Sequence, residues 1–396
     1  MLLIFLAHFQ PSLSSPTSAR SAPYETRTLT AASGSWMTYL AAPSAAAAVA
    51  RRTRCRPSSR GSELLPGSSQ LTYLEGRSVS DPTLKDYCKK MRAFLEWAVQ
   101  SGLDWTTTAG LDHALVLYMD KLFFLGMAGD VASKTLAAVK FYYPEVGRYG
   151  DLSLPRTSRA LAGWGKVVPR KTRLPVPWVL VTAIVGHLLS RGLVEHAVAV
   201  LLSFHAYLRP GECDSLTPMQ LVAPVAAAGS SAAHWALLLG PAELEKPTKV
   251  GAWDESVVLD QFGFLNDCLL KLKARSQKPD QRIWSFPPGD LAVQLQAAAE
   301  SLGLAGMGIT AYGLRHGGAS HDLLERTRSH LEVKARGRWR SDSMLRRYGK
   351  EARALAELHK APKSTVEYGR LVSEQLAAIF VSGAPLPPAP SQAPPS

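Results

Sequence analysis

The chain has 396 residues, which is enough for two domains with additional tails. Hydrophobic residues make up 46% of it and charged residues 19%, and this composition excludes a wholly disordered protein. The 45 Lys and Arg residues against 32 Asp and Glu residues give a formal net charge of +13, which favours a polyanionic partner, of which nucleic acid is the commonest.

Sequence patterns argue against three further classes: membrane-spanning proteins, zinc-binding proteins and small domains held by disulfides. No uninterrupted apolar run approaches the roughly 18–20 residues that a transmembrane helix needs. The histidines show no metal-ligand spacing, and the cysteines lie far apart without a C-x-x-C pair: Cys55, Cys88, Cys213 and Cys268. We therefore expect an intracellular protein with reduced cysteines, no metal, no cofactor and no membrane segment.

Residues 1–77 differ from the rest of the chain. They are rich in Ser, Ala, Pro and Arg, and Glu25 is the only acidic residue before Gly61. Two interpretations stay open: a disordered basic arm that adds salt-dependent affinity for nucleic acid, or a leader that directs the protein to an organelle. Without such a leader we expect a nuclear location if the source is eukaryotic.

The next segment, residues 78–168, predicts a small all-helical domain. Ser80 with Pro82 two residues later is typical of a helix start, and apolar residues then recur at helical spacing over 87–98. Further helices are expected over 112–125, 132–143 and 158–166. Residues 169–177 follow as a basic, proline-containing linker.

A larger mixed domain is predicted for residues 178–382. A hairpin of two strands, 233–239 and 256–259, interrupts a mostly helical pattern. Helices are expected over 179–189, 195–207, 260–275, 289–302, 311–326, 331–339 and 341–358. The proline-rich tail 383–396 is expected to be disordered. The fold class is thus mainly α (α+β), with an all-helical domain, a mostly helical second domain and a small antiparallel sheet.

Two clusters in the first half of the larger domain indicate anion binding. Arg209 ends an apolar helix, where burying a cation is costly unless an anion meets it. A salt bridge to Glu212 is the alternative. Lys249 lies in the polar turn of the hairpin, where the alternative is an ordinary solvated lysine.

Two more clusters follow towards the C-terminus. Thr310 is a candidate N-cap for a helix on which Tyr312 and Arg315 share a face. Glycines 317 and 318 allow close approach of another backbone, from protein or DNA. The last cluster, residues 337–349, contains Trp339 and Tyr348. Around it, from Arg315 to Arg353, there are eleven basic and five acidic residues, an excess typical of a surface that contacts phosphates.

The order and spacing of the four clusters resemble the tyrosine recombinase (phage integrase) family. The shared pattern is R-x-x-E, a lysine in a hairpin turn, an aromatic-x-x-R-H, and Trp339 with Tyr348 nine residues later, tryptophan being the residue of Cre-like members. The resemblance covers roughly residues 78–380. It implies that 78–168 is the core-binding (SAM-like) domain and that 178–382 is the catalytic domain. The composition of the N-terminal leader favours a eukaryotic mobile element as the source.

The resemblance also implies a role for each matching residue. Tyr348 would be the nucleophile that forms a 3′-phosphotyrosyl link without metal or ATP, while Arg209 and Arg315 would bind the non-bridging phosphate oxygens. The remaining roles are a general acid at Lys249, with Lys246 as the alternative, an indole N–H donor at Trp339, and an orienting carboxylate at Glu212.

One position departs from the family pattern. Histidine usually stands three residues before the second arginine, and here that residue is Tyr312. An ordinary tyrosine, with a pKa near 10, suits a general base poorly. His316 adjoins Arg315 but lies on a different face of the predicted helix, so we assign it only a supporting role.

Double-stranded DNA is the partner that the resemblance implies, bound by a homotetramer around two duplexes. A C-terminal helix over 371–380 would dock on a neighbouring protomer, or pack on its own core. The residues expected to contact DNA are Lys166, Arg170, Lys171, Arg173, Arg338, Arg340, Arg346 and Arg347.

Other functions remain open. A DNA-binding protein of the same fold could have lost catalysis, for which Tyr312 is the sequence indication. A helix-turn-helix regulator over 331–349 would leave Arg209 and Lys249 unexplained. Type IB topoisomerases share the chemistry but lack the core-binding helices.

Overall fold

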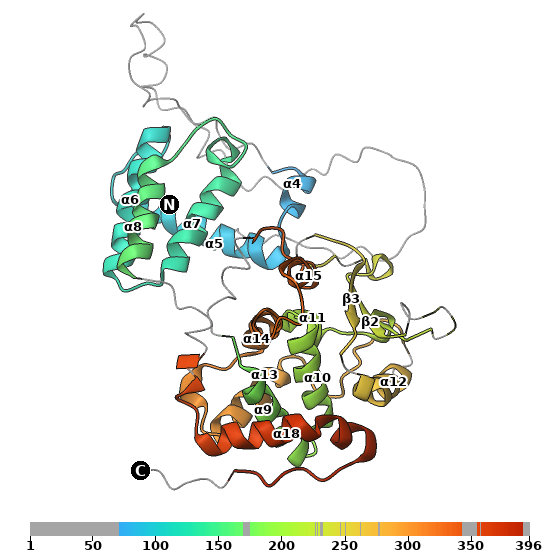
Figure 1. The fold of residues 1–396 in the computed structure, drawn as a ribbon. Helices are drawn as coiled ribbons and strands as arrows, with labels where there is room; N and C mark the ends of the chain where they lie inside the picture. Colours follow the sequence, from blue (N-terminus) through green and yellow to red (C-terminus); the bar gives the residue numbers. More distant parts are fainter. Residues whose placement is uncertain are drawn as a thin grey trace, which may run out of the picture. The chain divides into compact units, whose positions relative to one another are not determined.

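The structure, a computed structural model, describes residues 71–168, 175–225, 227, 229, 233–245, 247–249, 251–261, 263–275, 278–342, 355, 356 and 358–390. It is mostly helical with one small antiparallel sheet, which confirms the predicted fold class. The chain divides into two compact units, Met1–Lys171 and Thr172–Ser396 (Figure 1).

Long helices form the first unit: α5 (Asp81–Gln100), α6 (Thr108–Phe124), α7 (Gly129–Tyr142) and α8 (Pro155–Val167). They enclose one apolar core. A buried carboxylate fixes the start of α8 on α6, because Asp112 accepts hydrogen bonds from the backbone N–H groups of Arg156 (3.0 Å) and Thr157 (2.8 Å). α6 begins before residue 112, its predicted start, because the Thr107 hydroxyl caps it by accepting from the N–H of Gly110 at 3.0 Å.

A short helix, α4 (Tyr73–Arg77), lies in the segment predicted as a disordered arm or leader. Its start is a capping box: the Thr72 N–H donates to the Glu75 carboxylate at 2.7 Å, and the Glu75 N–H donates to the Thr72 hydroxyl at 3.4 Å. The prediction of irregular chain up to residue 77 is therefore wrong for these residues. Residues 1–70 lie outside the described part of the chain.

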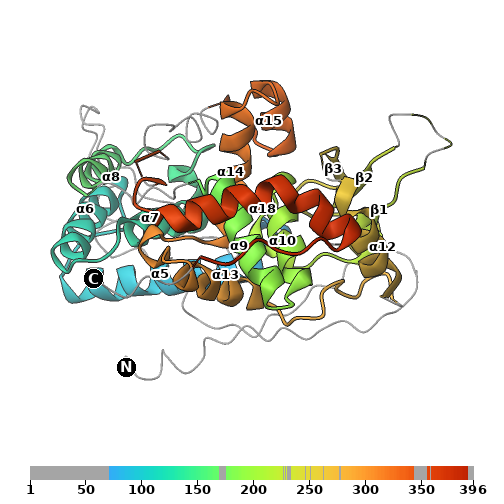
Figure 2. The same ribbon diagram turned by 60° about the horizontal axis from the view of Figure 1, so that its bottom comes forward.

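The second unit is built on two helices buried almost all round, α9 (Trp178–Ser190) and α10 (Val194–His205). α14 (Ala311–Leu324) packs on α10, and α18 (Lys363–Ser382) lies along α9, as Figure 2 shows. The contact of α18 with α9 requires glycine at position 369, because a Cβ there would lie 1.9 Å from the carbonyl oxygen of Val179.

The C-terminal helix packs on its own unit. α18 buries Tyr368, Val372 and Leu376 in the core of that unit, and the Phe380 ring lies 5.7 Å from that of Phe264. This is the second of the two alternatives predicted for residues 371–380. The homotetramer stays a prediction.

A three-stranded antiparallel sheet has the order β1-β2-β3. Its strands are β1 (Leu221–Val222), β2 (Trp235–Leu239) and β3 (Glu255–Leu259). β2 and β3 form the predicted hairpin, with Leu237 opposite Val257. The sequence does not predict β1, because two residues are too few to show the alternation of a strand.

The second unit also contains α11 (Pro210–Asp214), α12 (Asn266–Arg275), α13 (Asp290–Ser301) and α15 (His330–Arg336). α15 ends before its predicted limit, 339, because Arg338 adopts left-handed backbone with φ 55°. α12 begins six residues after its predicted start at 260, behind a short 3₁₀ turn over Gly263–Leu265. Most of the helix predicted over 341–358 lies outside the described residues.

The first part of the proline-rich tail is not disordered as predicted. After α18, Gly383 takes left-handed backbone with φ 66°, and the Ala384 N–H donates to the Ala378 carbonyl oxygen at 3.3 Å. The chain then runs back along α18 (Figures 1 and 2), with Pro387 buried. The reversal at Gly383 lets an extended segment pack without forming regular structure.

Candidate functional site

The first sequence cluster forms the start of α11. Arg209 precedes this helix, and its backbone N–H donates to Oε2 of Glu212 at 2.8 Å. The same carboxylate pairs through Oε1 with the Arg209 guanidinium, and both side chains are 13% exposed. The local salt bridge weighed as an alternative from sequence is thus present, and Glu212 sets the direction of Arg209.

Arg315 lies in the interior of the second unit. The Thr310 hydroxyl caps α14 by accepting from the Gly313 N–H at 3.1 Å, as predicted. Arg315 itself is only 1% exposed. Its Nη1 donates to the carbonyl oxygen of Tyr207, and its Nη2 donates to that of Gly337 at 2.5 Å. Arg315 therefore joins α14 to the segments that follow α10 and α15.

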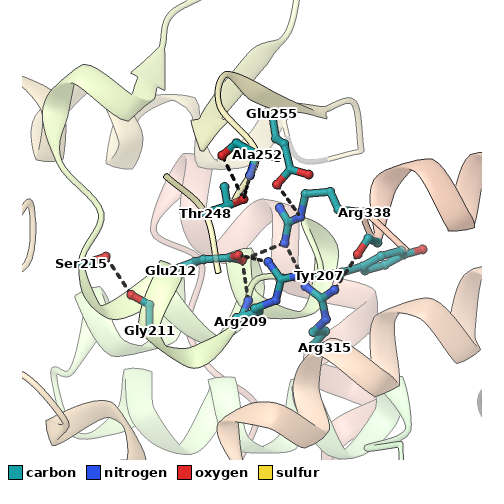
Figure 3. A network of polar contacts seen from close by, with 11 residues as sticks. Tyr207, Arg209, Gly211, Glu212, Ser215, Thr248, Ala252, Glu255, Arg315 and Arg338 are labelled. Atoms are coloured by element: carbon teal, nitrogen blue, oxygen red, sulfur yellow. Dashed lines mark hydrogen bonds and ion pairs between the residues drawn. The ribbon is translucent and has the colours of Figure 1, made fainter. Parts of the chain in front are cut away.

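A third arginine meets the other two (Figure 3). The side chain of Arg338, 3% exposed, donates through Nη2 to Oε2 of Glu212 at 2.7 Å and to the Tyr207 carbonyl oxygen at 3.2 Å. Its Nε lies 3.9 Å from Oε2 of Glu255 on β3. The prediction that Arg338 belongs to an open phosphate-binding surface is wrong, because the side chain is turned into the protein. We call Arg209, Arg315 and Arg338 the arginine cluster.

Carboxylates lie beside the guanidinium groups of the arginine cluster. In the described part of the chain these are Glu212 and Glu255. Burial lowers the pKa of Arg338 to about 10; Arg315 and Arg209 act in the same direction, while Glu212 opposes them. Three guanidinium groups gathered in one largely buried place favour a site that binds an anion.

Tyr207 connects the parts of this site, and sequence reasoning gave it no role. Its carbonyl oxygen accepts from two arginines of the cluster, and its hydroxyl donates to Asp322. Its ring stacks on that of Trp339, with centroids 6.2 Å apart. The backbone of Tyr207 is left-handed, with φ 46°, which is costly for a residue other than glycine. The one available sequence signal is its place between an apolar helix and Arg209.

Trp339 is buried against the arginine cluster. The Cζ atom of Arg315 lies 5.3 Å from the centre of its ring, within the range of a cation–π contact. The structure therefore brings together Arg209, Glu212, Arg315 and Trp339, four of the residues singled out from sequence.

A second group of charges lies on the other side of Tyr207. Arg328 donates to Asp322 at 2.9 Å and to Asp260 at 2.6 Å. Arg336 donates to the carbonyl oxygens of His205 at 2.7 Å and Val258 at 2.8 Å. Thus four of the eleven basic residues between positions 315 and 353 point into the protein: Arg315, Arg328, Arg336 and Arg338. The sequence shows the excess but not its burial.

Lys249 is exposed in a tight turn between β2 and β3. The turn is closed by the Gly251 N–H, which donates to the Thr248 carbonyl oxygen at 2.8 Å. The hairpin reaches the arginine cluster through Glu255 (Figure 3). Lys246 lies outside the described residues.

The remaining predicted residues divide into two groups. Tyr312 and His316 are half-buried one turn apart on α14, with ring centroids 4.9 Å apart, and Lys166 and Arg340 are exposed. The others lie outside the described residues: Arg170, Lys171, Arg173, Arg346, Arg347 and the predicted nucleophile Tyr348.

The described ranges contain no helix with the length and hydrophobicity of a transmembrane segment. In the same ranges, His, Cys, Asp and Glu residues form no group of three that could hold a metal ion.

A buried histidine beside this site makes stability depend on pH. Burial, with Arg336, Arg328 and His321 nearby, holds the pKa of His205 well below its ordinary value of 6.5. The unfolded chain therefore binds this proton at a higher pH than the folded protein. We expect the free energy of unfolding to keep its full value above pH 6.5. Below that pH it should fall by about 1.4 kcal/mol per pH unit. Urea denaturation across pH 5–8 measures the slope, and His205→Gln should flatten it; an equal slope in that variant would contradict the assignment.

The comparison with solved structures gives distant similarities. No family model and no curated protein matches the sequence. Among solved structures, the crystal structure of XerA recombinase is similar, with 14% sequence identity and a TM-score of 0.31, over 74% of this chain and 96% of that one. A similarity this weak does not establish a function.

Proposed function

We propose that this protein binds double-stranded DNA and cuts and rejoins its strands by tyrosine recombinase chemistry. The observation that carries the proposal is the convergence of Arg209, Arg315 and Arg338, from three separate segments, on Glu212 and the Tyr207 carbonyl. The order of the sequence clusters adds a nucleophile, Tyr348, nine residues after the tryptophan of this site.

The proposed reaction conserves the phosphodiester energy. The Tyr348 hydroxyl gives up its proton to solvent as its oxygen attacks the phosphorus, and the bond from phosphorus to the 5′ oxygen breaks. The product is a 3′-phosphotyrosyl link, which a 5′-hydroxyl of another strand reverses without ATP. Lys249 would supply the proton that the leaving 5′ oxygen needs.

The arginines would stabilise the negative charge of the transition state. A guanidinium offers paired N–H groups that fit phosphate oxygens and stays charged at working pH. One such preorganised donor contributes about 2.7–4 kcal/mol to catalysis. Trp339 would add packing and one indole N–H. A homotetramer around two duplexes and a nuclear location belong to this proposal as well.

Replacing Tyr348 by phenylalanine tests the proposal. We expect the wild-type protein to form an SDS-resistant adduct with a pool of nicked duplexes that carry a randomised centre, since cleavage next to a nick is trapped. Tyr348→Phe should form none, because it lacks the attacking oxygen. Tyr149→Phe is the matched control, since Tyr149 is 93% exposed in the first unit. An adduct in Tyr348→Phe would assign the nucleophile elsewhere.

A DNA-binding protein without catalysis is the second candidate. Both terminal amino groups of Arg315 are engaged by backbone carbonyl oxygens, and Tyr312 stands where the family usually has histidine. Salt-dependent binding of duplex DNA by the wild-type protein, with no adduct, would favour this candidate. A helix-turn-helix regulator would not require the arginine cluster.

A further inference from the structure

We infer that Arg338 is a positioning residue, which holds Arg209 and Arg315 in place and joins them to the β2–β3 hairpin. The sequence pattern gives it only a phosphate contact. The inference rests on the proposed function, because the two arginines that it orients are those proposed to bind the reacting phosphate. Three contacts of the Arg338 guanidinium support it.

The first contact fixes Glu212. One carboxylate oxygen of Glu212 faces the Arg209 guanidinium, and the other accepts from Arg338 at 2.7 Å and from the Arg209 backbone N–H at 2.8 Å. Arg338 thus completes the set of donors around this carboxylate. Without Arg338, Glu212 would keep its contacts with Arg209 alone among the described residues, and the direction of Arg209 would be less restricted.

The second contact is shared with Arg315. Arg338 and Arg315 both donate to the carbonyl oxygen of Tyr207. Two like charges meet at this oxygen, and each repels the other; Glu212 beside Arg338 offsets part of that repulsion. Arg338 therefore fixes the carbonyl that in turn fixes one amino group of Arg315.

The third contact reaches the hairpin that carries Lys249. The Nε atom of Arg338 lies 3.9 Å from Oε2 of Glu255, the first residue of β3. Within the described structure, this Nε, Nη1 of Arg338 and Oε2 of Glu255 are buried and have no hydrogen-bond partner. A small movement of the hairpin towards Arg338 would convert the ion pair into a direct hydrogen bond.

The salt dependence of DNA binding separates positioning from phosphate contact. A residue that neutralises one phosphate contributes about 0.9 to the slope of log K against log salt. Arg338 is 3% exposed, so we expect Arg338→Met to leave this slope unchanged on a mixed-sequence duplex. Arg340→Met is the reference for a lost phosphate contact, because Arg340 is exposed two residues further on and predicted to contact DNA.

The rate of adduct formation measures the positioning effect. With saturating nicked duplex, Arg338→Met should slow single-turnover cleavage on the order of 100-fold, the effect of a small misplacement of groups that act on the transition state. Arg338→Lys should recover part of the rate, since an ammonium can reach Glu212 but does not reproduce the planar fork. An unchanged rate, or a slope reduced as in Arg340→Met, would overturn the inference.

A measurement without DNA keeps the two proposals distinguishable. Arg338→Met, Glu212→Gln and the double variant are compared by urea denaturation, and the double variant should be more stable than the sum of the single effects indicates. Additive effects would overturn the inference whatever the DNA results. Non-additive effects with no wild-type adduct would instead overturn the proposed function, and the positioning role with it.

Discussion

An Arg315→Ala variant is expected to lose about 3–5 kcal/mol of folding stability and all covalent attachment to DNA. The loss of stability follows from the burial of the side chain, which is 1% exposed and donates to the carbonyl oxygens of Tyr207 and Gly337. Both carbonyls would be left buried with fewer donors, and a cavity would open beside Trp339.

Urea denaturation of the full chain measures this effect, followed through the transition of the second unit. Arg315→Lys should lie between wild type and alanine, because a single ammonium keeps the charge but does not reach both carbonyls in the same geometry. Lys271→Ala is the control, since Lys271 is exposed on α12 and should change stability by less than about 0.5 kcal/mol. A loss below about 1 kcal/mol in Arg315→Ala would contradict the described contacts.

A Gly318→Ala variant is expected to unfold the second unit or to destabilise it by at least about 3 kcal/mol. A Cβ at this position would lie 1.8 Å from the carbonyl oxygen of Phe204 and 2.8 Å from its carbonyl carbon. Both atoms belong to the backbone of α10, so a change of rotamer cannot relieve the overlap. α10 and α14 would have to separate. The segments that carry the arginine cluster would then move apart as well.

Gly163→Ala provides the matched control for this substitution. Gly163 is an exposed residue of α8, and a Cβ there would meet nothing within 4 Å. Alanine should therefore stabilise this helix by about 0.5–1 kcal/mol. Thermal unfolding followed by circular dichroism compares the two variants; a Gly318→Ala protein as stable as wild type would show that α10 and α14 are not in such close contact.

The sequence predicts long elements of this fold better than short ones. α5, α10 and α14 have enough turns for apolar residues to show helical spacing, whereas β1 has two residues and α4 has five. The limits of α15 depend on the left-handed backbone of Arg338, which no propensity of arginine indicates. Gly317 and Gly318 were predicted to allow close approach of protein or DNA, and the neighbours that the structure gives them are Val176, Phe204 and Tyr207.

The sequence predicts the part of the site that is built from charged or motif side chains, and it does not predict the part that is built from the backbone. Arg209, Glu212, Arg315 and Trp339 stand out by charge or by position in a motif, and the structure brings them together. The acceptor that joins two of the arginines is the main-chain carbonyl of Tyr207, and a carbonyl group is present at every residue. Tyr348 and Lys249 keep the roles that the sequence predicts for them as proposals.

The pairing of Arg209 with Glu212 has a consequence for which ligands this protein accepts. In the described state the arginine cluster already holds an internal carboxylate, so an incoming anion must compete with a group tethered three residues from Arg209. A free phosphate ion has little binding energy with which to do so. A polymer bound at many other points can share Arg209 with that carboxylate at small additional cost, so the pairing favours the binding of long polyanions over small anions.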